Sequence, residues 1–99
     1  MIAATFRARV IKDPPDALAW AAAIGALVKK KAGVDMEVLV RMGATQDIVW
    51  SQRYADLASY GKALEAIQAD PDYQAQVKVA QDKGFFDLTT LEAGIWRVL

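Results

Sequence analysis

Apolar residues recur along this chain at two different spacings, and each spacing predicts one kind of element. Alternation with polar residues, the pattern of a half-buried strand, predicts strands over 2–12, 34–42, 48–54 and 91–99. The third strand begins with Ile48, Val49 and Trp50, which are residue types that favour strands. A turn is expected over 43–47, and the stretch 85–90 is expected to be irregular.

Helical spacing marks the stretches before the second and the fourth strand. The apolar stripes are Ala17, Trp20, Ala21, Ile24, Leu27 and Val28 in the first stretch, and Leu57, Tyr60, Leu64, Ile67, Tyr73, Val77 and Ala80 in the second. An aspartate that can accept hydrogen bonds from free backbone amides stands at three expected helix starts, Asp13, Asp56 and Asp70. Glycines at 33 and 84 are placed to end helices. Because a proline follows Asp70, the second helix is expected to break there.

The order of these elements is β-α-β-β-α-β, which predicts a ferredoxin-like α+β fold. An antiparallel sheet then carries the helices on one face, and residues 1–99 are expected to form one domain. The last strand is apolar on both faces, with Gly94, Trp96 and Val98 on one and Ala93, Ile95 and Leu99 on the other. Since the helices can cover only one face of the sheet, we expect the other face to meet a second copy in a sheet-to-sheet homodimer.

Four features stand out in the middle of the chain. They are Gly43 before the third strand, the apolar strand that ends in Tyr54, the run YADLASYGKAL at the next helix start and the run ADPDYQ at the helix break. Together they resemble the dimeric α+β barrel superfamily and, within it, the small bacterial NIPSNAP-like proteins. The resemblance implies the same fold and a homodimer. Such proteins share their fold far more than their chemistry.

The charge and the missing residue types narrow the chemistry. Twelve basic and 12 acidic residues give a net charge of zero, which argues against nucleic acid and anionic membranes as partners. The sequence has no Cys, His or Asn, so it lacks the usual ligands of zinc, copper and haem and the Ser-His and Cys-His pairs of nucleophilic catalysis. We therefore expect no metal and no cofactor. In the resembling superfamily, cofactor-free monooxygenases rely on polar residues that include His or Asn, and haem-handling members rely on a His; this chain matches neither pattern.

The uncharged run 17–28 follows several basic residues, as the apolar core of a secretory signal does. Prolines and Asp16 interrupt the approach to this run, however, and lysines stand where a cleavage site would lie. The run is also shorter than the ~20 apolar residues that cross a bilayer. We expect an amphipathic core helix here and a cytoplasmic protein.

Arg7 and Arg9 project from one face of the first strand, which is central in the predicted sheet. A charged side chain in that position requires a partner. In a structural interpretation the partners are carboxylates of the sheet, for which Glu37, Asp47 and Glu92 are candidates. In a functional interpretation, Arg9 recognises a carboxylate or phosphate of a ligand. The sequence leaves open which face of the sheet carries the two arginines.

Two functions from different classes follow from these observations. The first is a homodimeric module that binds a small apolar or carboxylated molecule between sheet and helices. Trp50, Tyr60 and Leu64 would then form the walls of the site, and Arg9 would supply the anion contact. The alternative is a cofactor-independent enzyme, monooxygenase-like or cyclase-like, that acts on a small aromatic or polyketide-like substrate, although no positioned acid–base pair identifies its catalytic residues. A cleft filled by side chains would instead favour a structural dimer without a ligand.

Overall fold

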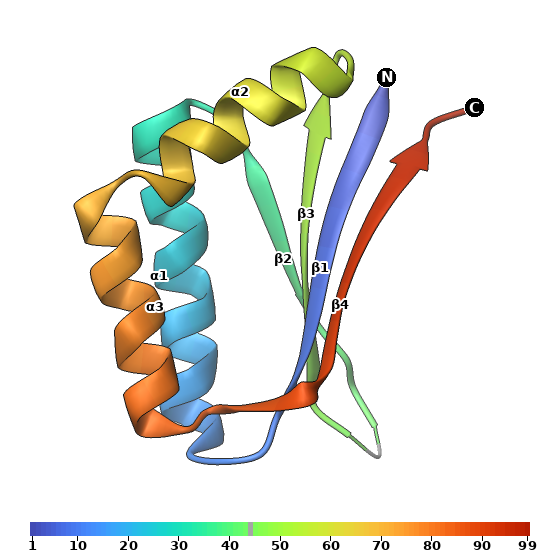
Figure 1. Cartoon of the computed structure of the whole chain (residues 1–99). Coiled ribbons are helices and arrows are strands. Elements are labelled where there is room, and N and C mark those ends of the chain that lie inside the picture. The colour runs from blue at the N-terminus through green and yellow to red at the C-terminus, as the bar shows by residue number, and fades with distance from the viewer. Residues whose placement is uncertain (44) are drawn as a thin grey trace.

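The computed structural model of the protein describes residues 1–43 and 45–99. Within them the elements are β1 (Ile2–Val10), α1 (Pro14–Ala32), β2 (Met36–Val40), β3 (Asp47–Tyr54), α2 (Leu57–Gln68), α3 (Pro71–Lys83) and β4 (Phe86–Arg97). The strands form an antiparallel sheet in the order β2-β3-β1-β4, and the helices lie together on one face of it (Figure 1). This arrangement confirms the predicted ferredoxin-like α+β fold, including the helix break at Asp70.

The strand ends differ from the prediction in a way that matters for the site. β1 and β2 are shorter than expected, whereas β4 begins at Phe86, so the stretch predicted to be irregular belongs to the strand. Its irregularity is a bulge, because β1 and β4 pair Arg9 with Asp87 and then Arg7 with Glu92. The predicted turn over 43–47 includes Ala44, which lies outside the described residues.

Each of the three helices begins directly after an aspartate, but only two of these aspartates cap the helix through the side chain. Asp56 accepts a hydrogen bond from the Ser59 amide at 2.8 Å, and Asp70 accepts one from the Tyr73 amide at 3.0 Å, as predicted. Asp13 does not cap through its side chain, which corrects the prediction. The backbone of Asp13 is in the left-handed conformation (φ 47°, ψ 62°), whereas Asp56 and Asp70 have the extended backbone that is typical of a residue that caps a helix through its side chain. Glycines in the left-handed conformation end α1 and α3 as expected.

The core lies between the sheet and α1. Buried side chains of β1 and β3 pack against the small residues of α1 in a cluster made of Ala8, Val10, Ala17, Ala21, Ile24, Ile48, Trp50, Ala80 and Phe85. α1 approaches closely because Gly25 faces β2, where an added Cβ would lie 3.1 Å from Val38. Five residues of α1 are buried, against one each of α2 and α3. The second and third helices therefore stand off from the sheet and leave space beneath them.

No helix in the described part of the chain is long and apolar enough to cross a membrane.

Candidate functional site

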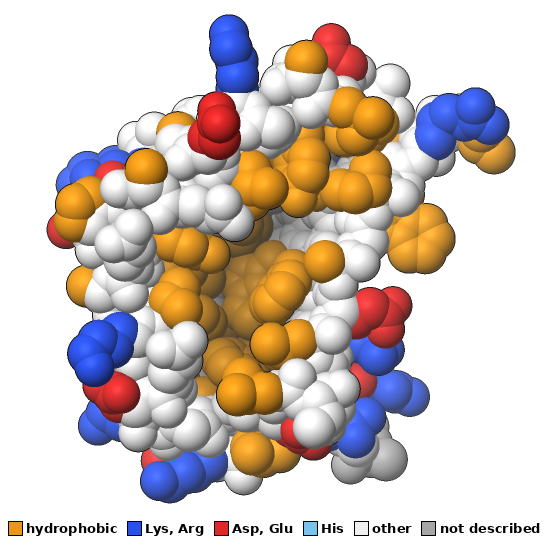
Figure 2. All heavy atoms as spheres, in the orientation of Figure 1, with side chains coloured by type: hydrophobic (Ala, Val, Ile, Leu, Met, Phe, Trp, Pro, Cys, Tyr) orange, Lys and Arg blue, Asp and Glu red, His pale blue; other side chains and the backbone are white. Residues whose placement is uncertain are grey.

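The space under α2 and α3 is an open cavity of about 400 Å³ (Figure 2). The inner face of the sheet forms its floor, since alternate residues of β1 and β3 point toward the helices. The walls come from the three helices and from β4. Residues that line it include Phe6, Trp20, Ile24, Val28, Trp50, Gln52, Tyr54, Tyr60, Ala63, Leu64, Ile67, Tyr73, Phe86, Leu88 and Leu91. The hollow seen in Figure 2 is accordingly edged with hydrophobic side chains.

An aromatic cluster occupies one part of the lining. Trp20, Trp50 and Phe86 contact one another edge to face, with ring centroids 5.5–6.2 Å apart, and Phe6 lies 5.9 Å from Trp50. Both indole N–H groups already donate to backbone carbonyls, that of Trp20 to Gln76 at 2.8 Å and that of Trp50 to Ala21 at 3.2 Å. The cluster thus offers the cavity apolar ring surface and no free donor.

The polar groups of the lining gather where β3 meets α2. The Tyr54 hydroxyl donates to Gln52 Oε1 at 2.9 Å, and the rings of Tyr54 and Tyr60 lie 5.3 Å apart. Burial, with a smaller contribution from Tyr60, raises the pKa of Tyr54 above its usual value, so this phenol stays protonated at neutral pH. Within the described part of the chain, no hydrogen bond uses the Gln52 amide nitrogen or the Tyr60 hydroxyl. Both groups are therefore free to contact a polar atom of a ligand.

Charged side chains are missing from the lining among the residues that the structure describes. The described lining therefore offers no cation to neutralise an anionic ligand and no carboxylate to accept a proton. The described residues also include no group of three or more acidic or metal-ligating side chains that could hold a metal ion.

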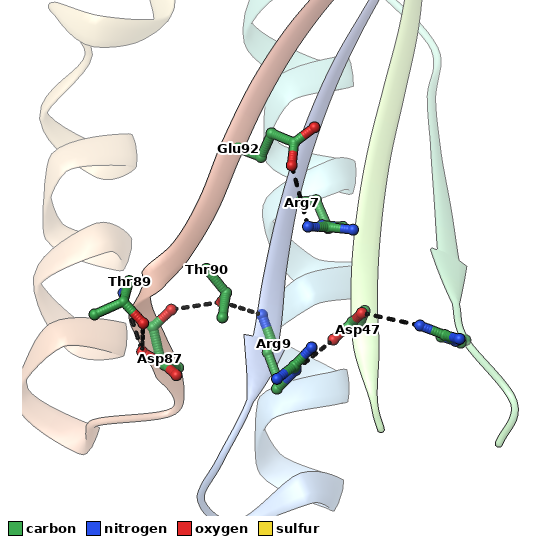
Figure 3. A network of polar contacts seen from close by, with 8 residues as sticks. Arg7, Arg9, Asp47, Asp87, Thr89, Thr90 and Glu92 are labelled. Carbon is green, nitrogen blue, oxygen red and sulfur yellow. Dashed lines mark hydrogen bonds and ion pairs between the residues drawn. The ribbon is translucent and has the colours of Figure 1, made fainter. Parts of the chain in front are cut away.

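The arginines lie on the outer face of the sheet, away from the helices (Figure 3). Arg9 Nε contacts Asp47 Oδ1 at 3.1 Å, Arg41 lies 3.6 Å from Asp47 Oδ2, and Arg7 pairs with Glu92 at 3.1 Å. The Arg9 guanidinium holds the pKa of the Asp47 carboxyl below its usual value, against the opposing effect of desolvation. These contacts confirm the structural interpretation of the arginines, with two of the three predicted carboxylates as partners.

Of the four residues predicted for a ligand site, the structure brings three together. Trp50, Tyr60 and Leu64 all line the cavity, but Arg9 does not. Ala8 and Val10 belong to the core beneath the helices, so strand alternation directs the side chain between them to the opposite face. The expected position of Arg9 inside the cavity therefore differs from the structure, and ligand binding by the other three stays a prediction.

Sequence reasoning did not assign Gln52 and Tyr54 to the site. A signal for both was present, because they follow Trp50 at intervals of two on the same strand and must share its face. Leu88 had no such signal, since its orientation depends on the bulge in β4.

The fold and the cavity together define a ferredoxin-like α+β protein with a ligand-sized hollow between sheet and helices. An uncharacterized NIPSNAP domain protein from Burkholderia xenovorans has the same fold, with a TM-score of 0.81 and 16% identity over 100% of this chain and 95% of that one. A NIPSNAP-like domain protein from the same organism gives a TM-score of 0.78 and 13% identity over 99% and 84% of the two chains. SnoaB, a cofactor-independent oxygenase from Streptomyces nogalater, gives 0.73 and 16% identity over 99% and 92%.

No family model and no curated protein matches the sequence. At these identities the structural likeness shows the fold, which is the one that the sequence resemblance to NIPSNAP-like proteins implied.

Proposed function

We propose that the protein binds a small, uncharged molecule with an apolar, ring-containing body in the cavity between sheet and helices. The observation that carries this proposal is about 400 Å³ of open space whose lining, over residues 1–43 and 45–99, includes no charged side chain. That volume falls within the range of roughly 300–1,000 Å³ that is usual for ligand sites.

The distribution of polar groups supports a neutral ligand with one polar end. The aromatic cluster around Trp20 and Trp50 suits an edge-to-face contact with a ring. Gln52 and Tyr60 can hydrogen-bond a carbonyl or hydroxyl at the other end of the ligand. A carboxylate in the same place would lose its water without gaining a cation, which is strongly unfavourable. The proposal therefore covers the apolar ligand expected from the sequence and leaves out the carboxylated one.

We also propose that the protein forms a homodimer of about 22 kDa, which is twice the 10.8 kDa of one chain. The helices cover the inner face of the sheet, while the outer face presents Leu39 and Trp96, 48% and 59% exposed, beside the arginine–carboxylate pairs. A surface that mixes apolar anchors with opposite charges can match a copy of itself across a two-fold axis. A cytoplasmic location, expected from the sequence, is part of the same proposal.

Titration with naphthalene and with 2-naphthoate, followed by fluorescence, tests the ligand class. We expect naphthalene to bind. The affinity for 2-naphthoate should be lower by about tenfold or more, because the charge of its carboxylate would be buried without a partner. Equal affinities would contradict an uncharged ligand.

A matched pair of variants on α2 locates the binding site. Ala63 lines the cavity, whereas Ala66 is exposed and lies outside it. Ala63→Trp should fill the cavity and abolish naphthalene binding, while Ala66→Trp should leave the affinity unchanged. If the two variants bind alike, the ligand does not occupy this cavity.

A second candidate is a cofactor-independent enzyme on an aromatic or polyketide-like substrate. Two observations favour it: the fold is shared with SnoaB, a cofactor-independent oxygenase, and the phenol of Tyr60 stands at the polar end of an apolar cavity. In such a reaction a substrate methylene would become a carbonyl, with one oxygen atom of O₂ entering the product and the other leaving as water. Oxygen uptake with anthrone, a polycyclic ketone that carries a ring methylene, compared between the wild type and Tyr60→Phe, distinguishes an enzyme from a binding protein.

A further inference from the structure

The bulge in β4 changes which residues of this strand face the cavity. Between the pairs Arg9–Asp87 and Arg7–Glu92, β1 advances by two residues and β4 by five. Three extra residues are an odd number, so the alternation of β4 is reversed beyond the bulge. Glu92 therefore points to the outer face, where it pairs with Arg7, and residues on both sides of the bulge line the cavity.

Two leucines reach the cavity by this means. Leu88 and Leu91 are three residues apart and would lie on opposite faces of a regular strand, yet both belong to the lining. They are 68% and 43% exposed, whereas floor residues such as Ala8 and Trp50 are buried. The two leucines consequently stand at the opening of the cavity, on the side formed by β4.

Hydrogen bonds on the polar side of the bulge fix its shape (Figure 3). Asp87 Oδ1 accepts from the amide and the hydroxyl of Thr89 at 3.0 and 2.7 Å. The Thr90 hydroxyl donates to the Asp87 carbonyl at 2.6 Å and accepts from the Arg9 amide at 3.0 Å. This last bond ties the bulge to the central strand and gives the backbone amide of Arg9 a partner.

We infer that Leu88 and Leu91, held in place by this bulge, select the ligand by its width. The inference rests on the proposed ligand cavity and adds the residues that determine its specificity. Thr90 is a positioning residue in this scheme, because it acts on the opening through the backbone of β4 and does not line the cavity.

Three neutral fluorescent hydrocarbons test the inference. Naphthalene and anthracene have the same width and differ in length, whereas pyrene is wider. The double variant Leu88→Ala/Leu91→Ala should raise the affinity for pyrene relative to anthracene by about tenfold, the usual scale for methylene-sized changes in an apolar pocket. Leu88→Trp should shift the ratio in the opposite direction. Leu57→Ala, on a leucine that is 63% exposed and lies outside the lining, should leave the ratio unchanged.

Thr90→Val tests the positioning role, because valine keeps the shape of threonine and removes both hydrogen bonds of its hydroxyl. We expect the pyrene to anthracene ratio to move in the direction of the double alanine variant. If the wild type binds none of the hydrocarbons, the proposed function and this inference both fail. If the wild type binds them and the leucine variants keep its ratio within twofold, only the inference fails.

Discussion

The inner face of the sheet places Ala8, Ile48 and Trp50 against the helices, whereas the outer face places Arg7, Arg9 and Asp47 one residue away on the same strands. The inner face is apolar and partly hollow, and its polar atoms belong to neutral groups. On the outer face, Arg7, Arg9 and Asp47 are each paired with a side chain of opposite charge. A central strand can therefore hold arginines without exposing the cavity to them.

Substitutions on the two faces of the sheet are expected to have different consequences. On the inner face a change of side chain alters packing or the volume of the cavity. On the outer face it alters an ion pair or the surface proposed for a second copy. Neighbouring residues of one strand thus provide matched tests of the two faces.

The largest effect is expected in the core. Ile48 is completely buried, so Ile48→Ala should lower the free energy of unfolding by about 2–5 kcal/mol, through lost burial and the cavity left behind. Val49→Ala, on the outer face of the same strand, should cost clearly less, because that side chain is only half-buried. Urea denaturation at low protein concentration measures both values, and equal losses would contradict the assignment of the faces.

The proposed homodimer depends on the outer face. Leu39→Asp places a charge on that face, and it should shift the sedimenting mass from near 22 kDa to the 10.8 kDa of one chain. Leu57→Asp puts the same charge on an exposed leucine of α2 and should leave the mass unchanged. A wild-type protein that sediments at 10.8 kDa at low micromolar concentration would overturn the homodimer itself.

Asp47, at the start of β3, pairs with Arg9 of β1 and with Arg41, which follows the end of β2. Asp47→Asn removes the shared negative charge, and at pH 7 it should lower the urea midpoint by less than Ile48→Ala does. Folding lowers the pKa of this carboxyl, so its ionised form stabilises the folded state. This contribution to the free energy of unfolding is complete above the pKa of an unfolded aspartate, about 3.9, and it disappears as the pH falls through the lower pKa of the folded state.

The difference between the wild type and Asp47→Asn should therefore shrink as the pH falls below about 4. Glu37, on the outer face of β2, is not part of an ion pair among the described residues and provides the control. Glu37→Gln should show a smaller loss at pH 7. A loss for Asp47→Asn that stays constant with pH would mean that its charge is not the cause.

The sequence was sufficient for the fold because its local signals agree with one another. The alternation of β1 and β3, the caps at Asp56 and Asp70 and the left-handed Gly84 each predicted an element that the structure contains. The cap prediction failed at Asp13, because its backbone is in the left-handed conformation and not in the extended one from which a side chain caps a helix.

The candidate site was predictable on its β3 and α2 sides, where Trp50, Tyr60 and Leu64 follow regular periods. Its β4 side was not, because an insertion of three residues in the ladder reverses the alternation without a local sequence pattern that fixes where it occurs. The position of Arg9 depended on knowing which face the helices cover. Only the long-range packing of Ala8 and Val10 settles that point.

The smallest expected effect concerns Trp96, which lies on the outer face of the sheet, whereas Trp50 lies on the inner face. Its indole N–H donates to Thr5 Oγ1 at 2.9 Å, and the ring lies over Gly94, where an added Cβ would come within 2.8 Å of Trp96 Nε1 and 3.0 Å of Thr5 Oγ1. Gly94→Ala should therefore displace the indole and cost about 0.5–1 kcal/mol, the net value of one exposed hydrogen bond.

The indole N–H resonances in an NMR spectrum can show this displacement. In Gly94→Ala the Trp96 signal should move, while the signal of Trp50, whose N–H donates to Ala21 under the helices, should stay. Thr5→Val removes the acceptor without crowding the ring, so it separates the lost hydrogen bond from the steric effect. If Trp96 keeps its resonance in Gly94→Ala, the ring does not rest on Gly94. The outer face would then lack the fixed aromatic anchor that a sheet-to-sheet contact with a second copy could use.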